Sequence, residues 1–221
     1  MSAERTMIKM MTENLPKESE VERVFRLIKG WILDCEIRPG AYVSELQLAR
    51  LCKSSRTPVR EACNRLSEGN WIERIPRRGY VVPPISTRDI VEIYEYRALL
   101  EGFAAERAAR LGGREELEAL ENLAVRERDP KKPLRELLAL NEEFHLAVAK
   151  IARNRRIEIQ LGEILEYVRR LDLLSIEKDH AAVTHEEIVA ALVARAPAKA
   201  KRAMVIHVEC SRDRMLKIFG G

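Results

Sequence analysis

Two consecutive prolines, Pro83 and Pro84, divide the chain of 221 residues into two parts with different patterns. Proline has no backbone N–H and a fixed φ angle, so a pair of prolines continues neither a helix nor a strand. Helical segments followed by β-prone segments precede the pair, whereas helical periodicity dominates after it. The sequence therefore predicts two domains, 19–83 and 86–219, which follow a flexible N-terminal arm over residues 1–18.

The composition is that of a globular protein rich in amphipathic helices, with 46% apolar and 33% charged residues. No run of about 18 apolar residues is present, which argues against a transmembrane helix, and the N-terminus lacks the apolar core of a secretion signal. Cys35, Cys52 and Cys63 stand singly among apolar helix positions, and we interpret them as buried, inert thiols. A cytoplasmic protein is expected.

The first domain is predicted to contain three helices and then a hairpin. Ser44 and Gln47 have the spacing of a capping box at the start of the second helix, and Ser55 and Thr57 suit the start of the third. This order is that of a winged helix-turn-helix. The expected segments are helices over 19–34, 45–52 and 56–70 and strands over 71–75 and 80–82.

A local excess of positive charge lies in the same region. Residues 53–78 carry four more Lys and Arg than Asp and Glu, which equals the net charge of the whole chain. Arg56 and Arg60, one helical turn apart, could read guanine in the major groove, while Ser55 and Thr57 could hold phosphates. Two arginines alone would indicate only a solvated face, but the capped helix before them and the basic hairpin after them favour DNA binding.

The run PGAYVSELQLARLCKSSRTPVREACNRL, followed by WIERIPRRGYVV, resembles the DNA-binding domain of GntR-family regulators. The resemblance covers residues 39–82 almost throughout, and SRTPVREA is its most specific motif. It implies that Arg56 and Arg60 read bases or flanking phosphates. It also implies that the neighbouring hydroxyl groups, those of Ser55 and Thr57, contact the DNA backbone.

The tip of the predicted wing belongs to the same surface. The resemblance implies a contact of Gly79 with the backbone and minor groove, and the cation Arg78 precedes it at the tip. The chain departs from the family at two places, with Lys53-Ser54 in place of Gly-Val and Asn70 in place of the Gly that ends the recognition helix. Neither departure removes a group expected to contact DNA.

Every segment of the second domain is predicted to be helical, with breaks at glycine, proline and asparagine positions. Six helices without a strand signal indicate an antiparallel helical bundle. The fold class expected for the whole chain is therefore mostly α. The expected helices cover residues 87–111, 114–128, 133–152, 155–176, 184–195 and 198–219.

Three of the four histidines fall on three different predicted helices of the bundle: His145, His185 and His207. A single histidine on a helix is usually a structural residue, but antiparallel helices can direct three imidazoles at one point. Three imidazoles there could bind a borderline divalent cation such as Zn²⁺ or Ni²⁺. The fourth histidine, His180, is interpreted as a surface residue.

The second domain resembles the FCD effector domain that defines the FadR subfamily of GntR regulators. The resemblance covers residues 87–219 and rests on YRALLEGFAAERAA, NEEFH, the Glu-x-Ile after His185 and the Ala-Met-x-x-His that ends at His207. It implies a divalent cation (Zn²⁺, Ni²⁺ or Mn²⁺) held by three histidines and an aspartate that helps to bind a carboxylate effector. Asn141 stands where that aspartate would be, and Glu142 is a poorly directed substitute.

Arg97 lies on one stripe of a long predicted helix with Tyr94 and Glu101. The resemblance implies that this arginine faces the effector cavity, where its guanidinium could pair with a carboxylate. The alternative is a salt bridge within the protein, to Glu101 or Glu166.

These features together predict a transcription regulator, specifically a repressor, and not an enzyme. It would bind a palindromic DNA operator as a homodimer and respond to a small organic acid, with help from a metal ion. A metal-dependent hydrolase or lyase is a weaker alternative, because no HExxH-type motif supplies a catalytic base. A second alternative is a constitutive DNA-binding protein whose helical domain only dimerises.

Overall fold

The computed structural model describes residues 18–129, 131–175 and 185–220. Contacts divide these residues into two compact units, which we call the N-terminal domain (18–32 and 36–84) and the helical domain (33–35 and 85–220). Residues 1–17 of the predicted arm and His180 lie outside the described residues. In the part of the chain that the structure describes, no helix is both long and apolar enough to cross a membrane.

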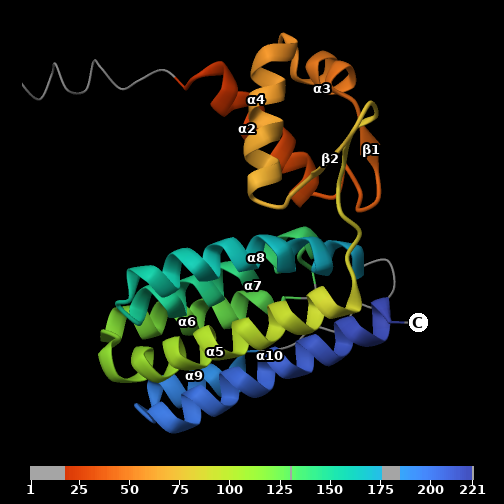
Figure 1. Ribbon diagram of the computed structural model, residues 1–221. Coiled ribbons are helices and arrows are strands. Elements are labelled where there is room, and N and C mark those ends of the chain that lie inside the picture. Colours follow the sequence, from red (N-terminus) through yellow and green to blue (C-terminus); the bar gives the residue numbers. More distant parts are fainter. Residues whose placement is uncertain (1–17, 130, 176–184, 221) are drawn as a thin grey trace, which may run out of the picture. The chain divides into compact units, whose positions relative to one another are not determined.

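The N-terminal domain contains three helices and a small antiparallel sheet with the strand order β1-β3-β2 (Figure 1). The central strand β3 pairs Tyr80 with Val43 on one side and with Arg74 on the other. The sequence did not reveal β1, because a strand of two residues has no periodicity. The elements are α2 (Glu20–Leu33), β1 (Tyr42–Val43), α3 (Glu45–Cys52), α4 (Arg56–Glu68), β2 (Glu73–Ile75) and β3 (Gly79–Val81).

Local signals in the sequence fix the ends of the two central helices. The Ser44 hydroxyl accepts from the backbone N–H of Gln47, whose side chain accepts from the backbone N–H of Ser44, so the predicted capping box is present. Helix α4 ends at Glu68, and Asn70 adopts the left-handed conformation with φ 58°. Asparagine adopts this conformation more readily than most residues. The sequence predicted the helix end at Asn70, and α4 ends two residues earlier.

The core of the N-terminal domain consists of the inner faces of its three helices and the sheet. Cys52 and Cys63 are both part of it, and burial raises the pKa of the Cys63 thiol to about 12, as expected of an inert thiol. The main apolar members of this core are Val24, Ile28, Ile32, Leu48, Val59, Leu66, Ile72, Tyr80 and Val82.

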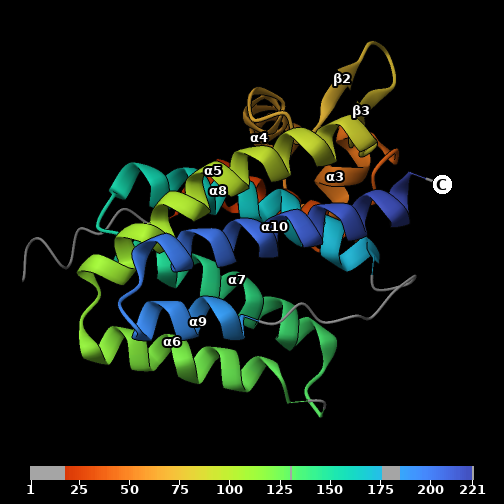
Figure 2. The ribbon, with the colours of Figure 1, turned by 90° about the horizontal axis from the view of Figure 1, so that it is seen from below.

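The helical domain begins directly after the two prolines, where Ser86 and Asp89 form a capping box for its first helix. That helix, α5, runs beside the C-terminal helix α10 for most of its length (Figures 1 and 2). Gly102 permits the close approach, because a Cβ atom there would lie 2.8 Å from Cγ2 of Val205. The helices are α5 (Thr87–Leu111), α6 (Arg114–Glu127), α7 (Leu134–Ile151), α8 (Arg155–Ser175), α9 (Glu186–Val193) and α10 (Pro197–Phe219).

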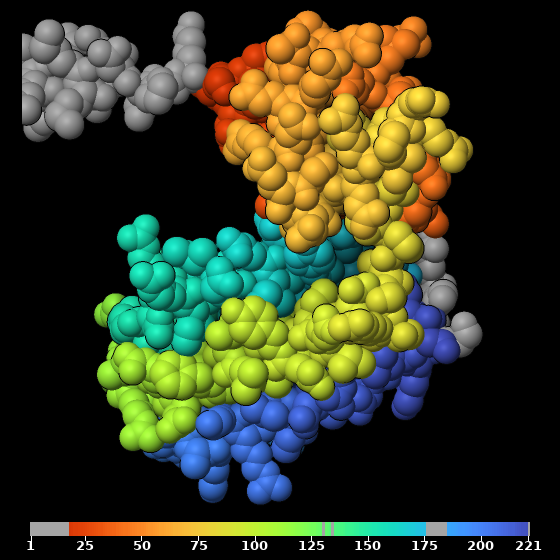
Figure 3. Space-filling view, viewed as in Figure 1, coloured from red at the N-terminus to blue at the C-terminus, as the bar shows by residue number. Residues whose placement is uncertain are grey.

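The helical domain buries small side chains of α5 against larger ones of the other helices. Figure 2 shows α6 and α9 side by side, and Figure 3 shows α5, α8 and α10 along one face of this domain. The predicted fold class is confirmed: the chain is mostly α, with a winged helix-turn-helix followed by an all-helical bundle. Buried members of this core include Ala104, Ala105, Ala108, Leu120, Phe144, Leu171, Leu192 and Met204.

Candidate nucleic-acid interface and candidate metal centre

A surface groove in the N-terminal domain lies between the first turns of α3 and α4 and the hairpin β2–β3. It carries five arginines against one glutamate, so its walls are strongly positive. Such a concentration of cations on one surface attracts a polyanion. The charged residues of the groove are Glu45, Arg56, Arg60, Arg74, Arg77 and Arg78.

Both arginines predicted to read DNA are exposed at the start of α4, and both pair with Glu45 of α3. The Nε and Nη2 atoms of Arg60 donate to the two carboxylate oxygens of Glu45 over 3.0 and 2.9 Å, and Nη2 of Arg56 donates over 3.3 Å. The hydrogen bond from Arg60 lowers the pKa of Glu45. Glu45 therefore orients the arginine pair, a role that the sequence alone did not predict.

The hydroxyl groups predicted to contact phosphates are also exposed. Ser55 occupies the N-cap position of α4 in an extended conformation, but its side chain forms no capping hydrogen bond. Its hydroxyl, and that of Thr57 in the first turn, are therefore free to bind a phosphate at the positive end of the helix.

The tip of the wing requires a glycine. Gly79 has φ 108°, and a Cβ atom there would lie 2.4 Å from the carbonyl oxygen of Val43 in β1. Arg77, two residues before it, also has a positive φ, of 65°. The guanidinium of Arg78 lies 4.9 Å from the centre of the Tyr42 ring. The turn thus holds the guanidinium of Arg78 beside Tyr42 of β1.

The three histidines predicted to bind a metal meet inside the helical domain. His145 comes from α7, His185 directly precedes α9, and His207 comes from α10. One nitrogen atom of each lies within 4.8 Å of those of the other two, and the Nε2 atoms of His145 and His185 are 3.2 Å apart. Burial lowers the pKa of all three, so the imidazoles are neutral at pH 7, as metal ligands must be.

Two carboxylates that the sequence analysis did not assign to this site contact the histidines. Glu101 of α5 contacts Nδ1 of His145, and Oε2 of Glu127, the last residue of α6, lies 2.5 Å from Nδ1 of His185. Of these two carboxylates, the sequence pointed only to Glu101, because Glu101 lies on the same helix stripe as Arg97. Glu127 carries no signal that single-sequence patterns could reveal.

Arg97 is fully buried and forms the internal ion pair that was one of its two predicted roles. Its Nε atom donates to Oε1 of Glu101 over 2.7 Å, and its guanidinium lies 5.0 Å from the centre of the Tyr94 ring. Burial alone would raise the pKa of Glu101, but the neighbouring Arg97 and His145 outweigh burial and hold it well below its usual range. Glu101 is therefore ionised at pH 7.

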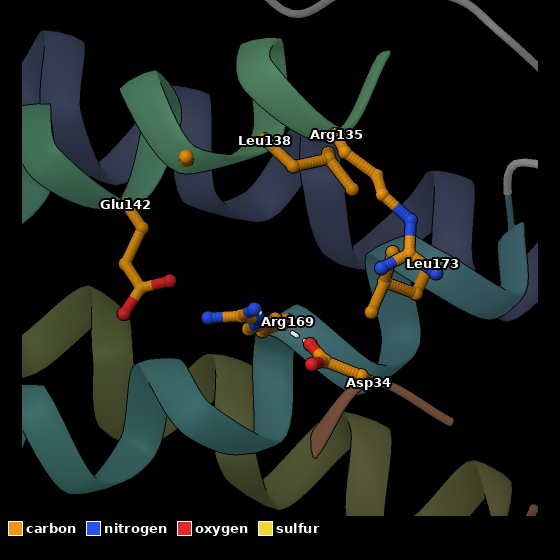
Figure 4. Close-up of a pocket in the computed structure, with 7 residues that line it drawn as sticks. Asp34, Arg135, Leu138, Glu142, Arg169 and Leu173 are labelled. Carbon is orange, nitrogen blue, oxygen red and sulfur yellow. Dashed lines mark hydrogen bonds and ion pairs between the residues drawn. The ribbon is translucent and has the colours of Figure 1, made fainter. Parts of the chain in front are cut away.

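The two other residues considered as ligands, Asn141 and Glu142, belong to α7, the helix that also carries His145. Asn141 is half-buried on α7, and none of the hydrogen bonds among the described residues joins it to the three histidines. Glu142 points into a separate pocket that it shares with Arg135, Arg169 and Asp34, as Figure 4 shows. The cluster of possible ligands within 4.8 Å contains the three histidines and no carboxylate of a described residue.

Comparison with known proteins agrees with both halves of the structure. Residues 20–82 match the family described as bacterial regulatory proteins, gntR family, and residues 92–209 match the FCD domain. The Nta operon transcriptional regulator of Aminobacter aminovorans is 28% identical over 83% of this chain and 89% of its own length. The "Probable D-xylose utilization operon transcriptional repressor" of Paenarthrobacter nicotinovorans is 31% identical over 76% of each chain.

A solved structure supports the same assignment. A GntR regulator from Rhodococcus sp. RHA1 is 25% identical, with a TM-score of 0.71 and coverage of 89% of this chain and 97% of that one. The FCD match alone spans more than half of the chain. These matches, the winged helix-turn-helix and the helical bundle give one conclusion: the chain is a transcription regulator of the GntR family with a C-terminal FCD domain.

Proposed function

We propose that this regulator represses transcription by binding a palindromic operator as a homodimer, and that a small carboxylate effector modulates the binding. The observation that carries the DNA half is the groove in which Arg56 and Arg60 are exposed beside the free hydroxyl of Ser55. Arginine can donate two hydrogen bonds to guanine, while hydroxyl and backbone N–H groups bind phosphates. Thr57, Arg78 and Gly79 complete the proposed DNA surface.

The proposal of a dimer on a palindrome follows from symmetry. A two-fold dimer presents two copies of α4, and these fit two half-sites of an inverted repeat. The proposed domain roles are DNA binding for residues 19–83 and effector binding with dimerisation for residues 86–219. The repressor assignment is supported by relatives whose names describe them as repressors. The cytoplasm is the proposed location, where the operator would be.

A divalent cation (Zn²⁺, Ni²⁺ or Mn²⁺) is proposed at His145, His185 and His207, and three converging neutral imidazoles favour Zn²⁺ or Ni²⁺ among these. A bound ion would supply a Lewis-acidic position for an oxygen of the effector. Arg97 is proposed to act with it on the carboxylate, because its bond to Glu101 uses Nε and does not require the Nη donors. The effector would be a compact organic acid or sugar acid.

The decisive experiment selects DNA from a random pool with the purified full chain and then footprints the selected site. We expect an inverted repeat protected on both half-sites, with binding that weakens steeply as salt increases. Zn²⁺, Ni²⁺ and Mn²⁺, each with a panel of organic acids, are then added in thermal-shift and footprinting assays. An effector should raise the melting temperature and change the footprint. If no acid does either, the helical domain only dimerises; if no DNA is selected, the proposal fails at its first step.

A further inference from the structure

In the candidate metal centre, His145 and His185 each have a carboxylate next to their Nδ1 atom. The Nε2 atom of each ring faces the other histidine. Glu101 contacts Nδ1 of His145, and Oε2 of Glu127 lies 2.5 Å from Nδ1 of His185. The Nε2 atoms of the same two rings face each other at 3.2 Å. The carboxylates therefore lie on the outer side of the imidazoles, and the candidate ion position lies on the inner side.

This arrangement orients the imidazoles for a cation. An Nδ1–H that donates to a carboxylate leaves the lone pair of Nε2 for an ion, and a carboxylate in that position also makes the imidazole a stronger ligand. Two nitrogen ligands at 2.0–2.1 Å from a tetrahedral Zn²⁺ lie roughly 3.3 Å apart. The separation of 3.2 Å between the Nε2 atoms of His145 and His185 fits this value.

The two carboxylates differ in how their charge is balanced. Glu101 also accepts from the buried guanidinium of Arg97, which neutralises it. Glu127 is mostly buried, its side chain 11% exposed, and within the described residues it forms no ion pair with any Lys or Arg. The neighbouring Arg128 pairs instead with Glu186. Glu127 is thus the carboxylate at this centre that no arginine of the described residues neutralises. Burial raises its pKa to about 7, and a cation on the inner side of His185 would favour its ionised form.

We propose that Glu127 is a positioning residue for the metal centre and supplies, through His185, the negative charge that Asn141 lacks. This inference rests on the proposed metal-binding function and adds a residue to it. Its consequence is that the three histidines bind a divalent cation although their set contains no anionic ligand. Glu127 does this without touching the ion, since its oxygen contacts the outer nitrogen of the imidazole.

The test compares the affinity of Zn²⁺ and Ni²⁺ for the full chain and its variants by competition with a chromogenic chelator. Glu127→Gln keeps the size and an acceptor oxygen but removes the charge, and it should weaken binding about 10- to 100-fold. Glu121→Gln is the matched control, because Glu121 lies on the same helix and is exposed. The melting temperature of each metal-free variant verifies that the fold is retained.

Two further variants separate charge from structure. Glu127→Asp keeps the charge on a shorter side chain and should stay within about tenfold of the wild-type affinity. Asn141→Asp restores an anionic ligand, so Glu127→Gln should cost less in that background than in the wild type. If Glu127→Asp loses as much affinity as Glu127→Gln, or if Glu127→Gln has the same effect in both backgrounds, the charge compensation is refuted.

A spectroscopic measurement reports on the orientation itself. In the Zn²⁺-loaded wild type, ¹⁵N spectra of the imidazoles should show the hydrogen of His185 on Nδ1, and this signal should change in Glu127→Ala. Equal metal affinity of the wild type and Glu127→Gln would overturn the inference alone. A wild-type chain that binds neither Zn²⁺ nor Ni²⁺ would overturn the metal part of the proposed function, and the inference with it.

Discussion

The same ionic chemistry, arginine against glutamate, occurs in both domains in opposite surroundings. At the N-terminal groove Glu45 holds Arg60 by two hydrogen bonds, and the arginine side chain is 54% exposed. In the helical domain Glu101 holds Arg97, whose side chain is 2% exposed. Water screens the pair of Glu45 and Arg60, so Arg60 can leave Glu45 for another partner at a small cost in free energy. The pair of Arg97 and Glu101 is fixed, because a buried charge without its partner is strongly destabilising. The exposed pair suits contact with a large ligand, and the buried pair suits a rigid frame.

The largest expected effect comes from breaking the buried pair. Glu101→Ala leaves the guanidinium of Arg97 buried without its carboxylate and should lower the free energy of unfolding by about 3–5 kcal/mol. It also removes the contact on His145. Denaturation with urea measures the loss. The double variant Arg97→Met with Glu101→Met should recover part of it, because no charge is then left unpaired. If Glu101→Ala were as stable as the wild type, the buried pair of Arg97 and Glu101 would contribute no more to stability than the exposed pair at Glu45.

The exposed region should show the reverse pattern, a loss of binding without a loss of stability. Arg56→Ala and Arg60→Ala should each weaken binding to the selected operator by about 1–3 kcal/mol where the arginine bonds a base. Their unfolding free energies should stay within about 0.5 kcal/mol of the wild type, because both side chains are at the surface. Titration of labelled operator measures the binding. Wild-type footprints from both variants would mean that α4 does not read the DNA.

Two serines at N-cap positions extend the comparison to uncharged groups. Ser44 caps α3 with its side chain, so Ser44→Ala should cost about 1 kcal/mol of stability. Ser55 forms no capping bond at α4, so Ser55→Ala should leave stability nearly unchanged and weaken only DNA binding. Thermal denaturation and operator titration of both variants separate the two roles. A large stability loss in Ser55→Ala would contradict the assignment of its hydroxyl to DNA.

The smallest stability effect is expected at Glu45. Glu45→Gln weakens an exposed pair and should change the unfolding free energy by less than about 1 kcal/mol. It also removes the one negative charge of the groove, so binding to unrelated DNA should become tighter and more dependent on salt. Binding to operator and to random duplex at several salt concentrations provides the measurement. A variant with unchanged preference for the operator would show that Glu45 does not restrict the arginine pair.

How much the sequence could predict depended on whether a residue acts through a local pattern. Caps, breaks and periodicity are local, so the capping box at Ser44, the end of the third helix close to Asn70 and the helices of the bundle could all be predicted. The histidines could be grouped because three residues of one rare type lay on separate helices. Their meeting within 4.8 Å still needed the packed structure.

The missed residues are those defined only by contacts distant in the sequence. Glu127 contacts a histidine 58 residues away, and Glu45 reaches an arginine 15 residues away. Glutamate is common on exposed helix faces, so neither position stands out in a single sequence. Only packing reveals that one of them is buried against a neutral imidazole and that the other is shared by two guanidinium groups.

The crowding at Gly79 has a consequence for genetic studies. Because a side chain there would collide with the carbonyl oxygen of Val43, every substitution must distort the pairing of β3 with β1. A screen for alleles that derepress a reporter would therefore recover Gly79 whether or not the residue touches DNA. Such alleles would report on the architecture of the wing, and suppressors would be expected in the β1 segment. Loss-of-function frequency at this position is thus a poor guide to the operator contacts, which exposed neighbours such as Arg78 can reveal directly.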